Sequence, residues 1–117
     1  MADADSITIE PEEYLIREGE ESTQMYFLKS GTMAVFKRKG DTTIQIGTIY
    51  SGEVVGEMSF LDKEPRSASV KAISDCELTV IPSEKFEKTL NALPAWYKAL
   101  VHTLLDRLRR ANSRIRV

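Results

Sequence analysis

The chain has 117 residues, a net charge of −2 and a single cysteine. This length suits one compact domain with one core and is too short for two. Hydrophobic residues make up 42% of the chain and charged residues 29%. That balance excludes a disordered chain and a protein that binds nucleic acid through its bulk charge. The single cysteine, Cys76, excludes an internal disulfide.

Three features favour a cytoplasmic location. No apolar run approaches the about 20 residues that a membrane-spanning helix needs, so we expect no membrane span. The first residues, "MADADS", are acidic and polar, unlike the apolar centre of a secretory signal. The lone cysteine gives no sign of an oxidising compartment. We therefore predict a cytoplasmic protein.

The first part of the chain, from about residue 6 to 82, is predicted to form β-strands. Runs of β-branched and aromatic residues alternate there with Gly, Ser and Asp. "YLIREGE" predicts a strand and a turn, and "MYFLKSGTMAVFKRKGDTTIQIGTIYSGE" predicts three strands. The breaks fall at Ser30-Gly31 and at Lys39-Gly40-Asp41. The second break favours a tight hairpin, because Gly40 readily adopts a positive φ.

Two further strands are predicted in "SVKAISDCELTVIP". Cys76, Leu78 and Val80 alternate in this stretch, so they are expected to share one face of a sheet. Many short strands at close spacing indicate a sandwich, a jelly roll or a barrel.

The hydrophobic period changes after Pro82, where two helices are predicted at about 83–92 and 95–116. Ser83 is a suitable N-cap, and Leu93-Pro94 ends the first helix because the residue before proline avoids the α conformation. The second helix carries an apolar seam at steps of four and three, formed by Tyr97, Val101, Leu104, Leu108, Ala111 and Ile115. Strands followed by helices define an α+β fold, which we assign to a single domain over residues 1–117.

The stretch "GEMSFLDKEPRSASV", Gly56 to Val70, carries the chemistry that points to a ligand. A glycine-led helical turn presents free backbone N–H groups, which bind anions. Arg66 adds a planar cationic fork that matches a phosphate, and Ser67 adds a hydroxyl. Glu57 suits the hydroxyls of a sugar, so the set predicts a pocket for a sugar phosphate. A salt bridge between Glu57 and Arg66 at the base of a loop is the structural alternative.

The longer stretch "GEMSFLDKEPRSASVKA" resembles the phosphate-binding cassette of cyclic-nucleotide-binding domains. That family includes the catabolite activator protein and the regulatory subunits of cyclic-AMP-dependent protein kinase. The preceding "YFLKSGTMAVFKRKGDTTIQIGTIYSGEVVGE" is similar to the strands before the cassette, with Gly31 and Gly52 at the expected turns. The resemblance implies an antiparallel β-roll (jelly roll) followed by two C-terminal helices.

The same resemblance implies a role for each cassette residue. Glu57 would bind the ribose 2′-hydroxyl and Arg66 the cyclic phosphate, while the backbone at Met58 and Ser59 would cap the phosphate. Ser67 would contribute its hydroxyl to the phosphate or to the purine edge. The residues thereby assigned to the ligand are Gly56, Glu57, Met58, Ser59, Arg66, Ser67 and Ala68. We expect cyclic AMP to be favoured over cyclic GMP.

The last helix has three roles open to it. Its seam could pack on the β-structure, or pair with the same helix of a second copy. It could also close over the base as a lid, as the resemblance to the family implies. Because the stripe is long for 117 residues to bury alone, we predict a homodimer. Candidates for contact with the base are Arg107, Arg110 and Asn112.

Other functions find less support in the sequence. His102 and Cys76 are the only residues of their kinds, so we expect no metal site of that type and no enzyme activity. The C-terminal arginines suit the negative end of a helix dipole better than nucleic acid, so we expect no direct nucleic-acid binding. We predict a regulatory sensor that passes the signal through its C-terminal helices to an effector domain or partner. The alternative is a dimerisation or interaction module of the same fold that binds no ligand.

Overall fold

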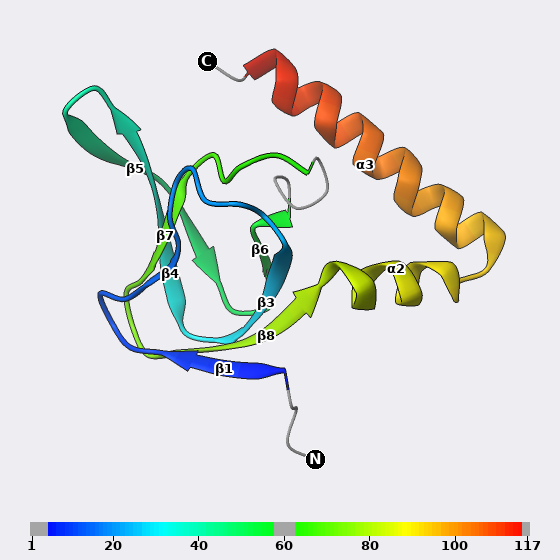
Figure 1. Ribbon diagram of the computed structural model, residues 1–117, viewed down its shortest axis with the longest axis horizontal. Helices are drawn as coiled ribbons and strands as arrows, with labels where there is room; N and C mark the ends of the chain where they lie inside the picture. The colour runs from blue at the N-terminus through cyan, green and yellow to red at the C-terminus, as the bar shows by residue number, and fades with distance from the viewer. Residues whose placement is uncertain (1–4, 58–62, 116–117) are drawn as a thin grey trace. The chain divides into compact units, whose positions relative to one another are not determined.

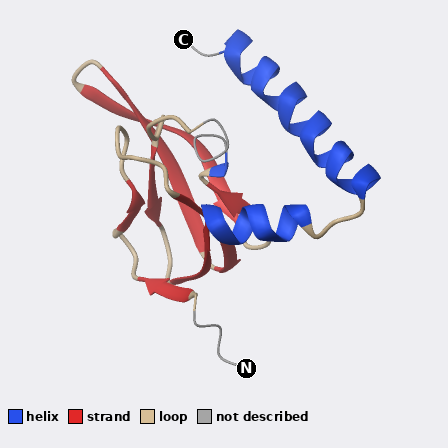
Figure 2. Cartoon of the chain, turned by 45° about the vertical axis from the view of Figure 1, so that its right-hand side comes forward, coloured by secondary structure: helices blue, strands red, loops and turns tan. Residues whose placement is uncertain are grey.

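The computed structural model describes residues 5–57 and 63–115, with no side chain described beyond residue 111 (Figure 1). Its contacts divide the chain into two compact units, Met1–Pro82 and Ser83–Val117. The strands, which Figure 2 draws in red, belong to the first unit, and helices α2 and α3 form the second. The assignment of all 117 residues to one domain stays a prediction.

In residues 5–57 and 63–82, the first unit has two four-stranded antiparallel sheets. The first sheet has the order β1 (Ser6–Ile9), β8 (Cys76–Pro82), β3 (Gln24–Ser30) and β6 (Val54–Val55). The second sheet has the order β2 (Tyr14–Ile16), β7 (Ser69–Ala72), β4 (Thr32–Lys39) and β5 (Thr42–Tyr50). Apart from β4 and β5, which form a hairpin, neighbouring strands in each sheet are distant in sequence, as in a jelly roll. The predicted class, an antiparallel β-roll followed by two helices, is therefore confirmed.

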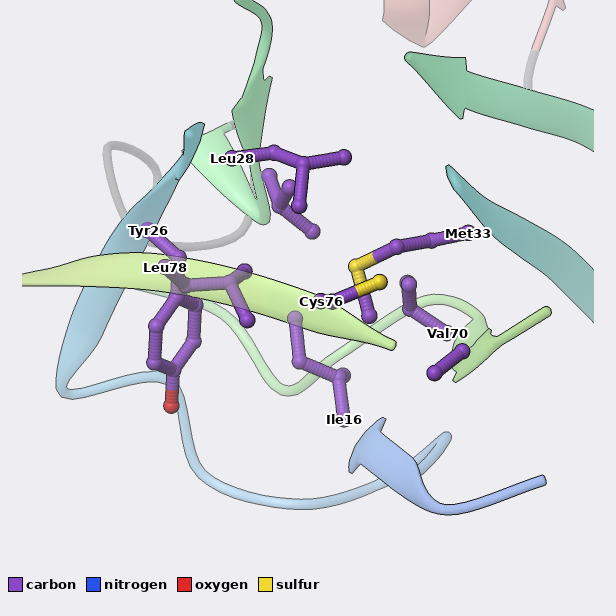
Figure 3. Packing of buried hydrophobic residues seen from close by; sticks show 9 residues of the cluster. Ile16, Tyr26, Leu28, Met33, Val70, Cys76 and Leu78 are labelled. Carbon is purple, nitrogen blue, oxygen red and sulfur yellow. The ribbon is translucent and has the colours of Figure 1, made fainter. Parts of the chain in front are cut away.

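Side chains from both sheets form one core in the first unit. Leu28 and Leu78 of the first sheet and Met33 of the second have no exposed surface, and Figure 3 shows them together with Cys76. Each fully buried side chain of this size contributes about 1.5–3 kcal/mol of transfer free energy. Cys76 and Leu78 are buried and Val80 packs against the core, so the predicted shared face of β8 is confirmed.

Strands β4 and β5 form the predicted hairpin. Lys39 pairs with Thr42, so the loop contains only Gly40 and Asp41. Gly40 has a φ of +63°, and a glycine with positive φ in the first loop position is the pattern of a type II′ turn. Figure 1 shows this hairpin as a long arm that extends from its sheet.

Replacing the turn glycine is expected to destabilise the first unit. In Gly40→Ala the new Cβ meets no atom within 4 Å, so the cost is the left-handed backbone alone, about 1–2 kcal/mol. Thermal unfolding should show a midpoint lower by several degrees. Gly47→Ala is the matched control, because Gly47 lies in β5 without a positive φ and its Cβ would lie 3.9 Å from that of Val35. Equal midpoints for the two variants would contradict the turn assignment.

The second unit contains α2 (Ser83–Asn91) and α3 (Ala95–Ile115). At the end of α2 the backbone N–H groups of Ala92 and Leu93 donate to carbonyls three residues earlier, at 3.2 Å each. Such bonds tighten a last helical turn. Within its own unit α3 leaves large apolar side chains exposed, namely Trp96, Tyr97, Leu100, Leu104 and Leu108. None of the helices in the described ranges is long and apolar enough to cross a membrane.

Candidate ligand-binding site

The two described ends of the connector between β6 and β7 come together around one arginine. Gly56 follows β6 directly, and Arg66 precedes β7 by three residues. Nη1 of Arg66 donates a hydrogen bond of 2.7 Å to the carbonyl oxygen of Gly56. The start and the end of the connector are thereby joined at the guanidinium.

Arg66 is a buried cation, with only 5% of its surface exposed. Its Nη2 donates to the carbonyl oxygen of Gln24 at the start of β3. Burial lowers the pKa of the Arg66 guanidinium, and the charges of Tyr26, Glu20 and Glu57 oppose that shift. An arginine stays protonated at neutral pH even so. The structure therefore holds a permanent positive charge inside the first unit.

A short turn after β2 fixes the main chain of this arginine. The N–H of Arg66 donates to the carbonyl of Glu20, and the N–H of Gly19 donates to the carbonyl of Arg66, both at 2.8 Å. The turn is closed by its own bonds, because the N–H of Arg17 donates to Oε1 of Glu20 at 2.8 Å. We call residues 17–20 the supporting turn, since it positions the Arg66 backbone.

The guanidinium faces a hollow of about 160 Å³, which we call the inner hollow. Its lining combines an apolar wall with the polar residues of the connector: Ile16, Val35, Ile49, Val70, Gly56, Glu57, Arg66, Ser67 and Ala68. Five of the seven residues that the sequence assigned to the ligand thus lie around one space. The hollow offers a cation, a carboxylate and a hydroxyl beside aliphatic side chains.

Gly56 cannot carry a side chain here without displacing its neighbours. Its φ is +75°, and a Cβ at this position would collide with Nη1 of Arg66 and lie 2.9 Å from Cδ1 of Ile16. Contacts between carbon atoms are favourable only from about 3.5 Å. The glycine therefore allows the guanidinium to lie directly against the backbone.

The remaining predicted residues are not placed at the inner hollow. Met58 and Ser59 lie outside the described residues. Arg107 and Arg110 are exposed residues of α3, and Asn112 lies on the same helix with its side chain outside the described part. Their predicted contacts with a ligand stay predictions.

The sequence reasoning missed the apolar wall and the acceptors that hold Arg66. Ile16, Val35 and Val70 belong to strands in which side chains alternate between faces, so the signal for the wall was present in the strand pattern. The carbonyls of Gln24 and Gly56 are backbone groups, which no residue-type pattern reveals.

The groups at the inner hollow suit an anion that also carries hydroxyls. A buried guanidinium is a bidentate partner for a phosphate or carboxylate, and a carboxylate accepts hydrogen bonds from hydroxyls. Within residues 5–57 and 63–115 no group of three or more His, Cys, Asp and Glu side chains is placed to hold a metal ion. Fold and site together define a small ligand-binding β-roll.

The chain belongs to the cyclic nucleotide-binding domain family. The family model matches residues 6–92, which is most of the chain and includes the inner hollow. The resemblance noted in the cassette sequence is therefore confirmed.

Relatives of the chain occur in proteins of different kinds. The chain is 30% identical over 105 residues to the human potassium/sodium hyperpolarization-activated cyclic nucleotide-gated channel 4, covering 90% of this chain but only 8% of the channel. It resembles the EAL enzyme Bd1971 in its half-site-occupied form, with 28% identity, a TM-score of 0.82 and coverage of 92% and 96%. It also resembles the catabolite activator protein of Thermus thermophilus, with 28% identity, a TM-score of 0.77 and coverage of 94% and 52%.

Proposed function

We propose that this chain is a regulatory sensor that binds a cyclic nucleotide in the inner hollow. The observation that carries the proposal is Arg66, a cation almost withdrawn from water that shares the hollow with the carboxylate of Glu57. A buried charge is costly unless it is hydrogen-bonded and paired with an opposite charge. A cyclic phosphate supplies one negative charge, and its ribose supplies a hydroxyl.

In this proposal each polar side chain of the inner hollow binds a different part of the ligand. Arg66 binds the cyclic phosphate, and Glu57 accepts a hydrogen bond from the ribose 2′-hydroxyl. Ser67 donates its hydroxyl to the phosphate or the purine edge, and Ala68 completes the wall. The resemblance to the family adds the backbone of Met58 and Ser59 as a cap on the phosphate.

The size of the inner hollow supports an assignment to the sugar phosphate. Its volume of about 160 Å³ is below the roughly 300–1,000 Å³ of pockets that hold a whole small molecule. The sugar phosphate therefore occupies the hollow, and the base extends out of it. On grounds of sequence alone, the candidates for contact with the base are Arg107, Arg110 and Asn112.

Cyclic AMP is the ligand that we propose. Bd1971, which is 28% identical to this chain, has a cAMP-bound form with a TM-score of 0.72. The same enzyme has a cGMP-bound form, with 27% identity and a TM-score of 0.74. Titration calorimetry with each nucleotide tests the proposal, with linear 5′-AMP as the control. We expect saturable binding of one cyclic AMP per chain and weaker binding of cyclic GMP.

The output of the sensor is proposed to run through α2 and α3 to an effector domain or partner, with α3 pairing two copies. A ligand shifts such a system only through its different affinities for two states. The competing proposal is an interaction module of the same fold that binds no nucleotide. If calorimetry of the folded chain gave no heat of binding with either cyclic nucleotide, the result would favour the interaction module.

Glu57→Gln tests the contact with the ribose. The neutral amide is a poorer acceptor than the carboxylate, so we expect affinity for cyclic AMP to fall about five- to tenfold. That is roughly the difference between a hydrogen bond to a charged group and one to a neutral group. With 2′-deoxy cyclic AMP the same substitution should change the affinity little, because the hydroxyl is missing. Calorimetry of both proteins with both ligands completes the cycle. Equal losses for the two ligands would contradict a ribose contact.

A further inference from the structure

A second hollow lies on the first unit, with a volume of about 480 Å³. It takes its lining from β2 and the supporting turn, from the β4–β5 hairpin and from β7, through Tyr14, Arg17, Glu18, Gly19, Phe36, Arg38, Thr43 and Ser69. We call it the outer hollow. Its volume falls within the range of about 300–1,000 Å³ that is usual for small-molecule sites.

The two hollows lie on opposite faces of the sheet β2-β7-β4-β5. Neighbouring residues in a strand point to opposite faces. On β4, Val35 lines the inner hollow and Phe36 the outer one. On β7, Val70 lines the inner hollow and Ser69 the outer one. The outer hollow is therefore separate from the proposed cyclic-nucleotide site.

Cations and aromatic rings alternate along this outer face. Cζ of Arg17 lies 4.3 Å from the ring centroid of Tyr14. Nζ of Lys71 lies 5.7 Å from the centroid of Tyr14 and 5.2 Å from that of Phe36. These distances are those of cation–π contacts. Nζ of Lys71 is also paired with Oε2 of Glu12 at 2.9 Å. The face thus combines planar apolar surface with the positive charge of its arginines.

The positive charge of the outer hollow exceeds its negative charge. Arg17 and Arg38 line it against one carboxylate, Glu18, whose Oε1 already accepts from the N–H of Arg38 at 3.0 Å. Within residues 5–57 and 63–115, the Arg17 guanidinium has no hydrogen bond or ion pair. The side chain of Arg38 donates only from Nε, to the carbonyl of Gly40 at 3.2 Å. Both arginines therefore retain N–H donors for an anion.

We propose that the outer hollow binds a small aromatic anion, a planar ring that carries a phosphate or a carboxylate. The free donors of Arg17 and Arg38 match the oxygens of such a group, which arginine binds in a bidentate manner. The Phe36 ring supplies a surface for the planar part, and the Thr43 hydroxyl adds a donor. An inorganic anion would use the cations and leave the ring surface unused.

NMR amide shifts of the isotope-labelled chain, titrated with phenyl phosphate, test this proposal. We expect saturable shifts at Arg17, Gly19, Arg38 and Thr43, with a Kd on the order of 1 mM for a ligand this small. Arg17→Gln and, as a second variant, Arg38→Gln should each weaken binding about tenfold or more, the value of one charge-assisted hydrogen bond. Lys39→Gln, an exposed cation outside the hollow, is the matched control and should bind as the native chain does.

Three outcomes would overturn the proposal. These are the absence of saturable shifts at millimolar phenyl phosphate, shifts confined to Gly56, Glu57 and Ser67 of the inner hollow, and equal affinity for inorganic phosphate, which has no ring. The test does not depend on the proposed function, because Arg66→Ala should leave the shifts at Arg17 and Thr43 intact. In an Arg66→Ala chain that keeps native amide shifts at Gly19 and Glu20, loss of the shifts at Arg17 and Thr43 would place the ligand in the inner hollow. That result would be a fourth outcome against the outer hollow.

Discussion

Arg66→Ala is expected to lower the affinity for cyclic AMP at least about tenfold. A charge-assisted hydrogen bond contributes roughly 1.5–3 kcal/mol, and each 1.4 kcal/mol is a factor of about ten in Kd. The loss follows because the buried guanidinium is the cation of the inner hollow. Titration calorimetry on the folded variant measures it directly. Unchanged affinity would remove Arg66 from the ligand site.

The same substitution has a structural cost that must be separated from binding. It leaves the carbonyls of Gly56 and Gln24 without their donor, which costs about 1–3 kcal/mol when such groups are buried. Arg66→Lys keeps the charge but loses the fork, so we expect an affinity between those of the native chain and the alanine variant. Lys39→Ala removes an exposed cation at the hairpin and should leave affinity unchanged. Thermal unfolding of all three variants reports the structural part.

Gly56→Ala is expected to abolish most of the affinity although it removes no polar group. The added methyl collides with Nη1 of Arg66 and lies 2.9 Å from Cδ1 of Ile16, so the guanidinium has to leave its position. The φ of +75° adds a backbone cost of about 1–2 kcal/mol. We expect a loss of at least about tenfold, as for removal of the arginine, together with a lower unfolding midpoint.

Gly52→Ala is the matched control for the collision. Gly52 also has a positive φ, +94°, but a Cβ there meets no atom within 4 Å. Both variants carry the backbone strain, and only Gly56→Ala disturbs the arginine. We therefore expect similar destabilisation from the strain but native affinity in Gly52→Ala. A comparable loss of affinity in both would show that backbone strain, and not the position of Arg66, limits binding.

Local signals made the fold class predictable. The hairpin at Gly40 was predicted from a glycine between two strand-like runs. The break before Pro94 was predicted because the residue before a proline avoids the α conformation. The order of strands before helices followed from the change in hydrophobic period after Pro82. The cassette was recognisable because its residues are close in sequence, from Gly56 to Ala68, and five of them line the inner hollow.

The hydrogen bonds that hold Arg66 could not be predicted from the sequence, because their partners are backbone groups distant along the chain. Gln24 and Arg66 are 42 residues apart. Every residue has a backbone carbonyl, so the sequence does not indicate which carbonyl accepts from the guanidinium. The bonds to Gly19 and Glu20 are likewise backbone bonds. The outer hollow was missed for a related reason. Tyr14, Phe36 and Ser69 come from three strands, and only the pairing of those strands brings them to one face.

The supporting turn has a consequence for the rate at which the proposed sensor would bind its ligand. Ordering the backbone of one residue costs roughly 1–2 kcal/mol. The two backbone hydrogen bonds that join Arg66 to Gly19 and Glu20 form on folding and offset this cost before any ligand binds. In the proposed function, an arriving nucleotide therefore finds the backbone of its cationic residue already in place. We expect capture to be limited by encounter, and the duration of the signal to be set by how slowly the nucleotide leaves.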